Sequence, residues 1–210
     1  MRIMKIALIA ILFGLAWKAE ADELGNEIAE LQHAWATGYY STQEDQREDY
    51  FKLWRIKAHM ITEEFPGRAE PLIWEGIITS TLAKYQSIFS AGGTAKDARD
   101  MLLAAARIDP NALDGSALTS LGSLYYKVPR FGSFGGYDKA RSYLEQALKV
   151  DPNGIDQNYF YGELLSIQGD KAGAIAHLKK ALAAPPRPGR EDADAGHRAE
   201  ISQLLARLRE

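Results

Sequence analysis

Small, large and proline residues recur at one fixed spacing in three segments of the chain. In each segment an alanine, a leucine, a second alanine and a proline fall at offsets 0, 4, 7 and 12. The three sets are Ala98, Leu102, Ala105 and Pro110, then Ala140, Leu144, Ala147 and Pro152, then Ala174, Leu178, Ala181 and Pro186. Offsets 0, 4 and 7 share one face of an α-helix, and the proline ends that helix. The pattern predicts three helices, each with a narrow face that a neighbouring helix can approach closely.

A partner helix is predicted ahead of each of these three, so the unit is a helix–turn–helix. Its apolar and small positions are Leu118, Leu121, Gly122 and Tyr125 before the second helix, and Asn158, Tyr161, Gly162 and Leu165 before the third. The arrangement resembles the tetratricopeptide repeat, a two-helix module of 34 residues. We expect unit 1 at 67–110, unit 2 at 111–152 and unit 3 at 153–186.

The three units differ in how closely they follow the pattern. Unit 3 fits without gaps, and unit 2 carries about eight extra residues, mostly in the Gly/Phe-rich insert 128–136. In unit 1 the first helix is predicted to continue to about Phe89 and to end at Ala91-Gly92-Gly93, because glycines are poor helix formers.

The flanks of the array also read as helical. Residues 22–66 predict a degenerate helical pair, in which Ser41 and Glu44 form a capping box that starts a helix ending near Glu64. Residues 187–210 predict a proline-rich break and a capping helix over 191–209. Its apolar stripe is Ile201, Leu204, Leu205 and Leu208. The expected fold is all-α: antiparallel helical hairpins stacked as a tetratricopeptide-like right-handed superhelix, closed by a C-terminal capping helix.

The first 21 residues have the pattern of a cleaved signal peptide. Arg2 and Lys5 precede an apolar run of about a dozen residues, 6–17, and Ala19-Glu20-Ala21 offers a small-residue cleavage site. The run is too short to span a bilayer core of ~30 Å. We expect export to the periplasm and no membrane span after cleavage; the alternative is an N-terminal anchor that is retained.

The composition of the chain excludes cysteine-based sites and argues against nucleic-acid binding. The chain has 210 residues, no cysteine and a formal net charge of −3. Without cysteine there can be no disulfide, thiolate metal site or cysteine nucleophile. A near-neutral charge argues against nucleic-acid binding, which needs a concentrated basic face.

No set of residues predicts catalysis or metal binding. The histidines, at positions 33, 59, 177 and 197, lie in four different predicted helices without a ligand partner at i+3 or i+4, so we expect surface or edge positions for them. Asp151 to Asp156 superficially resembles a calcium loop, but position 12 of such a loop would be Gly162, and a turn between repeats explains the segment better. We therefore expect no enzyme, no metal and no cofactor.

Repeat arrays of this kind bind their partners on a concave face, which the first helix of each unit lines. The register predicts these inward positions: Glu70, Ile73, Ile77, Ser80 and Thr81; Ser116, Thr119, Ser123, Tyr126 and Lys127; Asp156, Tyr159, Glu163, Ser166 and Ile167. Trp35, Trp54 and Trp74 lie on amphipathic helices and are predicted to be core. A small, polar and aromatic concave face suits a partner segment or a small ligand.

The insert 128–136 is the least regular part of the array. It exposes Arg130, Phe131 and Phe134 in a glycine-rich loop. Two phenylalanines on a surface loop either fold back over a neighbouring hairpin or contact a partner, and both interpretations stay open.

Residues 121–208 resemble a narrower family. The segments are Leu-Gly-Ser-Leu-Tyr-Tyr-Lys-Val-Pro at 121–129, Asp-Pro-Asn-Gly-Ile-Asp at 151–156, Asn-Tyr-Phe-Tyr-Gly-Glu at 158–163 and Ala-Pro-Pro-Arg-Pro-Gly-Arg at 184–190. They look like the T-component of tripartite ATP-independent periplasmic (TRAP) transporters. The resemblance implies a periplasmic all-α protein that associates with a solute-binding protein. It also implies that Tyr126, Lys127, Asn158, Tyr159 and Glu163 lie near the ligand or partner surface. The chain departs from the family in having no lipobox cysteine, and its first half matches only in helical style.

Two functional hypotheses follow. The first is an exported, non-catalytic scaffold that binds another periplasmic protein such as a solute-binding protein, with a homo-oligomer as a further partner. The second is a binder of a small hydrophobic or carboxylated ligand in the concave pocket. The candidate binding residues are Tyr126, Lys127, Arg130, Phe131, Phe134, Asp156, Asn158, Tyr159 and Glu163.

Overall fold

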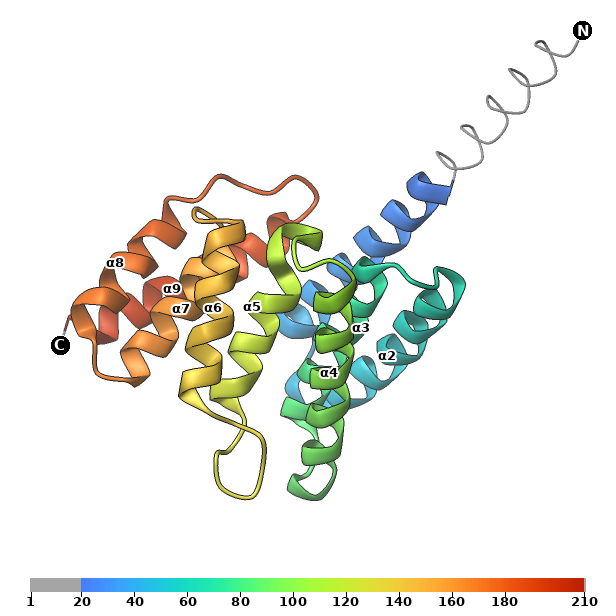
Figure 1. Ribbon diagram of the computed structural model, residues 1–210, viewed down its shortest axis with the longest axis horizontal. Coiled ribbons are helices and arrows are strands. Elements are labelled where there is room, and N and C mark those ends of the chain that lie inside the picture. Colours follow the sequence, from blue (N-terminus) through green and yellow to red (C-terminus); the bar gives the residue numbers. More distant parts are fainter. Residues whose placement is uncertain (1–19, 210) are drawn as a thin grey trace, which may run out of the picture.

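The structure is a computed structural model that describes residues 20–209, and every regular element in that range is helical. An N-terminal helix (described over 20–36) continues into the π-helical turn η1 (Thr37–Ser41). There follow η2 (Glu44–Gln46), α2 (Arg47–Glu64), α3 (Ala69–Tyr85), α4 (Ile88–Ile108), α5 (Ala112–Lys127), α6 (Tyr137–Val150), α7 (Ile155–Ile167), α8 (Lys171–Leu182) and α9 (Glu191–Arg207). Figure 1 shows the hairpins α3–α4, α5–α6 and α7–α8 stacked side by side. The expected all-α fold of paired hairpins is confirmed.

A glycine on the first helix of each hairpin faces the repeated leucine of the second helix. A Cβ built on Gly76, Gly122 or Gly162 would lie less than 3.0 Å from the Cγ of Leu102, Leu144 or Leu178, respectively. The leucines and the repeated alanines that flank them are fully buried. Glycine is needed at this position because any side chain would push the two helices apart. The repeated spacing in the sequence therefore corresponds to this close contact between the two helices of each hairpin.

The boundary between α3 and α4 differs from the prediction. α3 ends at Tyr85, and Gly92 and Gly93 lie inside α4 rather than at a helix end. Both glycines are exposed, with no neighbouring atom within 4 Å of a built Cβ. The prediction was wrong because the packing of the buried face of α4 against α3 outweighs the intrinsic helix cost of two glycines, about 1 kcal/mol each.

We expect Gly93→Ala to stabilise the protein by about 0.5–1 kcal/mol, because alanine is the better helix former and nothing obstructs its methyl group. Urea unfolding followed by circular dichroism measures the change. A decrease in stability would mean that α4 is not helical at this residue.

The predicted capping box is absent from the structure. α2 begins at Arg47, after the short 3₁₀ turn η2, and none of the N-cap residues of η1, η2 or α2 makes a side-chain cap hydrogen bond. The Thr42 hydroxyl instead donates to the Thr37 carbonyl at 3.1 Å, which closes the π-helical turn. This local bond keeps Ser41 in the π-helical turn, so Ser41 does not serve as the N-cap of α2.

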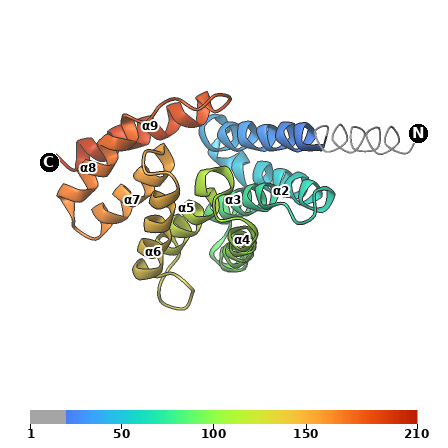
Figure 2. The same ribbon diagram turned by 45° about the horizontal axis from the view of Figure 1, so that its top comes forward.

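The N-terminal helix and α9 meet across the concave side of the array. Figure 2 shows their ends in contact. Gly196 lies so close to the Tyr40 ring that a Cβ there would clash with it, and the Tyr40 hydroxyl donates to Glu200 at 3.3 Å. The Trp35 and His197 rings pack edge to face at 5.8 Å. The capping helix therefore closes the array onto its own N-terminal end, as well as covering α7 and α8.

The predicted signal peptide, 1–21, lies outside the described residues except for Glu20 and Ala21, which are helical. Within the part of the chain that the structure describes, no helix combines the length and apolarity needed to cross a membrane.

Candidate binding cleft

A cleft of about 810 Å³ runs between the first helices of the three hairpins and the pair formed by the N-terminal helix and α9. We call it the central cleft. Its walls combine aromatic, hydroxyl and charged side chains. The aromatic residues are Trp35, Tyr39, Trp74, Phe131, Tyr159 and Phe160. The hydroxyl residues include Ser80, Thr81, Ser116, Thr119, Ser120 and Ser123. The charged residues are Lys84, Lys127, Asp156, Glu163, Arg190 and Glu200. A volume of this size lies within the range of small-molecule sites and also admits a peptide segment.

The two ends of the central cleft differ in chemistry. Ser116 near the start of α5 and Lys127 at its end are 11 residues apart, which corresponds to about 16 Å along the helix. Near the start of α5 and α7 lie Asp156 and Arg190. Near their ends Ile88 and Phe131 line the mouth, which is formed by the α3–α4 turn and the 128–136 loop at the lower edge of Figure 1. The Asp156 end of the cleft is thus charged, whereas the mouth combines the apolar Ile88 and Phe131 with the lysines Lys84 and Lys127.

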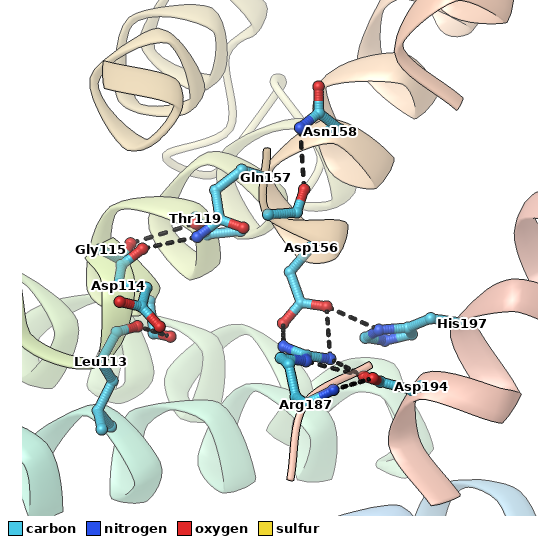
Figure 3. A network of polar contacts seen from close by, with 12 residues as sticks. Leu113, Asp114, Gly115, Thr119, Asp156, Gln157, Asn158, Arg187, Asp194 and His197 are labelled. Carbon is cyan, nitrogen blue, oxygen red and sulfur yellow. Dashed lines mark hydrogen bonds and ion pairs between the residues drawn. The ribbon is translucent and has the colours of Figure 1, made fainter. Parts of the chain in front are cut away.

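Asp156 is the centre of a polar network at the charged end (Figure 3). Its carboxylate oxygens lie 2.7 Å from the Arg187 guanidinium and 2.8 Å from His197 Nδ1. Arg187 also pairs with Asp194 at 2.6 Å. Burial raises the pKa of Asp156, but the neighbouring His197 and Arg187 outweigh it and hold that pKa well below its usual range. The network joins α7, the proline-rich break and α9.

The start of α5 has an unusual backbone at the same end. Leu113, Asp114 and Gly115 are successive left-handed residues, with φ of 48°, 56° and 76°. For a residue with a side chain this conformation costs about 1–2 kcal/mol. The Gln157 amide donates to the Asp114 carbonyl at 2.6 Å, and the Ser116 hydroxyl donates to the Leu113 carbonyl at 2.6 Å, as part of the same region as the network in Figure 3. These bonds hold the turn, so that regular helix, and with it the cleft-lining face of α5, begins at Ser116.

Glu163 is the centre of a second polar group, on the wall nearer the mouth. It accepts a short hydrogen bond from the Tyr126 hydroxyl and lies 3.2 Å from Lys127 Nζ. Burial and the nearby carboxylate of Glu163 both raise the pKa of Tyr126, so this phenol is a hydrogen-bond donor rather than an acid. Lys127 also lies over the Phe160 ring at 4.9 Å. Tyr126 thus orients Glu163 from beneath the cleft wall.

The structure brings five of the nine sequence-predicted site residues to the central cleft: Lys127, Phe131, Asp156, Tyr159 and Glu163. Tyr126 is buried behind them, and it reaches the cleft only through Glu163.

Three of the nine predicted site residues are placed away from the cleft. Asn158 is fully buried, and its amide donates to the Pro152 and Gly154 carbonyls at 3.0 and 2.9 Å, so it holds the turn between repeats. Phe134 folds back onto Tyr125, edge to face at 5.5 Å. Arg130 stacks over the Tyr137 ring at 4.9 Å. Local packing accounts for each of them, while Phe131 is 99% exposed.

Two further sequence predictions need correction. Trp35, predicted as core, is only partly buried; it lines the cleft and donates from Nε1 to the Thr81 hydroxyl at 2.9 Å. His197 was predicted at a surface or edge but is 4% exposed and contacts Asp156. Among residues 20–209, no three His, Asp or Glu side chains are grouped so that they could share a metal ion.

Sequence reasoning missed the wall opposite the hairpins: Trp35, Tyr39, Arg190, His197 and Glu200. These residues lie in the degenerate N-terminal pair and in the cap, where no repeat register assigns an inward face. The one local signal was the aromatic spacing Trp35, Tyr39, Tyr40 on an amphipathic helix.

Comparisons with known proteins agree with this architecture. The family model of the tetratricopeptide repeat matches residues 133–153. A crystal structure of a thermophilic tetratricopeptide-repeat protein of Thermus thermophilus superposes with a TM-score of 0.58 at 16% identity, covering 87% of this chain and 99% of that one. Cellulose synthase operon protein C of Escherichia coli O157:H7 is 28% identical over 189 residues, which is 83% of this chain; the chain spans only 15% of that relative's length. The molecule is therefore a helical repeat scaffold with a tetratricopeptide-type fold.

Proposed function

We propose that this tetratricopeptide-type scaffold is an exported, non-catalytic protein that binds a partner protein at the mouth of its central cleft. One observation carries the proposal: Ile88, Phe89 and Phe131 are 85%, 95% and 99% exposed. Ile88 and Phe131 line the mouth, and Phe89 follows Ile88 directly. Large apolar side chains gathered at the rim of a concave site are typical of protein contact surfaces.

The finer proposal is that the partner is a solute-binding protein of a periplasmic transporter. It is supported by the signal-peptide pattern of residues 1–21 and by the resemblance of residues 121–208 to TRAP T-components. The matched relative is named for a cellulose synthase operon, so a protein of cellulose synthesis is the competing kind of partner.

Affinity purification of the tagged protein from its natural host, followed by mass spectrometry, tests this function. We expect the variant Phe89→Ser with Phe131→Ser to lose at least about 90% of the dominant co-purified protein, because the mouth loses its apolar contacts. The matched control is Leu53→Ser with Met60→Ser, which removes two side chains of 65% and 59% exposure from α2. Equal recovery with both variants would contradict binding at the mouth.

A second candidate function is small-ligand binding in the central cleft. The observation that favours it is the cleft volume of about 810 Å³ with aromatic side chains on both walls: Trp35 and Tyr39 on one, Tyr159 and Phe160 on the hairpin wall. The two functions are compatible, since a partner at the mouth could receive or deliver a molecule held inside.

A further inference from the structure

Arg190 is a cation in the central cleft without an anionic partner. Among residues 20–209, no carboxylate lies within ion-pair distance of its guanidinium, and its buried Nε has no hydrogen-bond acceptor. The guanidinium instead lies 5.2 Å from the centre of the Trp74 ring. Trp74 is 2% exposed, and its own Nε1 donor also lacks an acceptor. Two buried donors without acceptors therefore lie together on the cleft wall, where such groups are normally paired.

Neither of the two nearby acids, Asp156 and Asp194, makes an ion pair with Arg190, because Arg187 lies between them, although both attract its charge. Asp156 is bound by Arg187 and His197, and Asp194 is bound by Arg187. Burial lowers the pKa of Arg190, and Asp156 offsets this only in part. A partly buried guanidinium whose hydrogen-bond donors have no acceptor favours a charge-assisted hydrogen bond to an anion. An anion that enters the cleft would meet this need.

The other side chains of the cleft indicate which groups the anion has besides its charge. From Arg190 to the mouth the walls present Trp35, Tyr159 and Phe160, with the serine and threonine hydroxyls of α3 and α5 between them. The mouth ends in Ile88 and Phe131. The other acids near the cleft are paired as well: Glu163 with Lys127 and Glu200 with the Tyr40 hydroxyl. A molecule with one acidic end and an apolar body about 16 Å long or shorter matches this distribution.

We propose that the central cleft binds an amphiphilic organic anion, with its carboxylate on Arg190 and its apolar body directed toward Ile88 and Phe131. This inference rests on the second candidate function, ligand binding in the cleft, and adds the class and the orientation of the ligand. Arg190 is the recognition residue, and Trp74 shares in the contact through its ring and its Nε1 donor.

Titration of the full chain with decanoate and with 1-decanol tests the proposal, since the two probes share an apolar chain and differ in charge. Binding is followed by tryptophan fluorescence, because Trp35 and Trp74 line the cleft, and by isothermal titration calorimetry. We expect decanoate to bind at least about tenfold more tightly than 1-decanol, and Arg190→Gln to remove that preference, because a charged hydrogen bond is lost. Binding of 1-decanol should change by less than about twofold in the same variant.

Lys84→Gln is the matched control variant. Lys84 also lines the cleft but donates to the Tyr39 hydroxyl at 2.8 Å, so we expect the preference for decanoate to persist. Arg190→Lys keeps the charge and should retain part of the preference for decanoate. This result would show that the loss in Arg190→Gln comes from the missing charge and not from a folding defect.

Each remaining outcome overturns part of the proposal. Equal affinity for the two probes would leave a cleft that binds apolar ligands and would overturn the anion assignment alone. Loss of the preference in Lys84→Gln but not in Arg190→Gln would place the carboxylate at the opposite end. No binding of either probe would overturn both the inference and the ligand-binding function.

Discussion

Replacing Arg187 by leucine is expected to lower the free energy of unfolding by about 3 kcal/mol, at the lower end of the range for a broken buried ion pair. Arg187 lies between two carboxylates, with contacts of 2.7 Å to Asp156 and 2.6 Å to Asp194. Its removal leaves both acids largely buried, with side-chain exposures of 16% and 6%, and without their common counter-ion. The value is at the lower end because the Arg187 side chain is itself 26% exposed.

Urea unfolding at pH 7 and at pH 3 measures this effect and its pH dependence. The pKa of Asp156 is depressed in the folded protein, so its contribution to stability is present above the unfolded pKa of ~3.9 and is lost as the pH falls below it. The difference between wild type and Arg187→Leu should therefore be smaller at pH 3 than at pH 7.

Arg190→Leu is the matched control for Arg187→Leu, since it removes the same charge three residues away. Among the described residues Arg190 makes no ion pair; it has a cation–π contact to Trp74 and a longer-range attraction to Asp156 and Asp194, so its loss should cost less than about 1 kcal/mol. Equal destabilisation by the two substitutions would mean that the ion-pair network does not stabilise the closure of the array.

The contact between Gly122 and Leu144 should show strong coupling between its two residues. Gly122→Ala alone is expected to cost about 1–3 kcal/mol, because its Cβ would lie less than 3.0 Å from Leu144 Cγ. Leu144→Ala alone is expected to cost about 2–5 kcal/mol, since Leu144 is fully buried and its loss leaves a cavity. In the double variant the added methyl group occupies space that the leucine vacated. The destabilisation of the double variant should therefore be smaller than the sum of the two single destabilisations by about 1 kcal/mol or more.

Equilibrium unfolding of the three variants and the wild type completes the cycle. Gly162 and Leu178 offer an independent repetition, with a distance of 2.9 Å from the built Cβ to Leu178 Cγ. Additive costs in both hairpins would show that the glycines are kept for another reason than this close approach.

The helix face that carries these leucines was predicted correctly from the sequence. The offsets of 4 and 7 between Ala140, Leu144 and Ala147 place these residues on one helix face by geometry alone, and all three are fully buried. The turns between repeats could also be predicted from the Asp-Pro-Asn sequence. In the structure Asp151 accepts a hydrogen bond from the Asn153 backbone, as in turns of this type. Reasoning failed at the α3–α4 boundary, where tertiary packing overrides the low helix propensity of Gly92 and Gly93.

The sequence by itself determined the helical repeat, the register of its buried face and part of the hairpin wall of the cleft, because these follow from a local period of 3.6 residues. Only the tertiary structure decided that the cleft has a second wall. The contact of Tyr40 with Gly196 and Glu200 joins residues about 160 positions apart, and within residues 20–209 both acids near Arg190 form their ion pairs with Arg187 instead. Such pairings depend on which surfaces the superhelix brings together, and no local pattern in the chain specifies them.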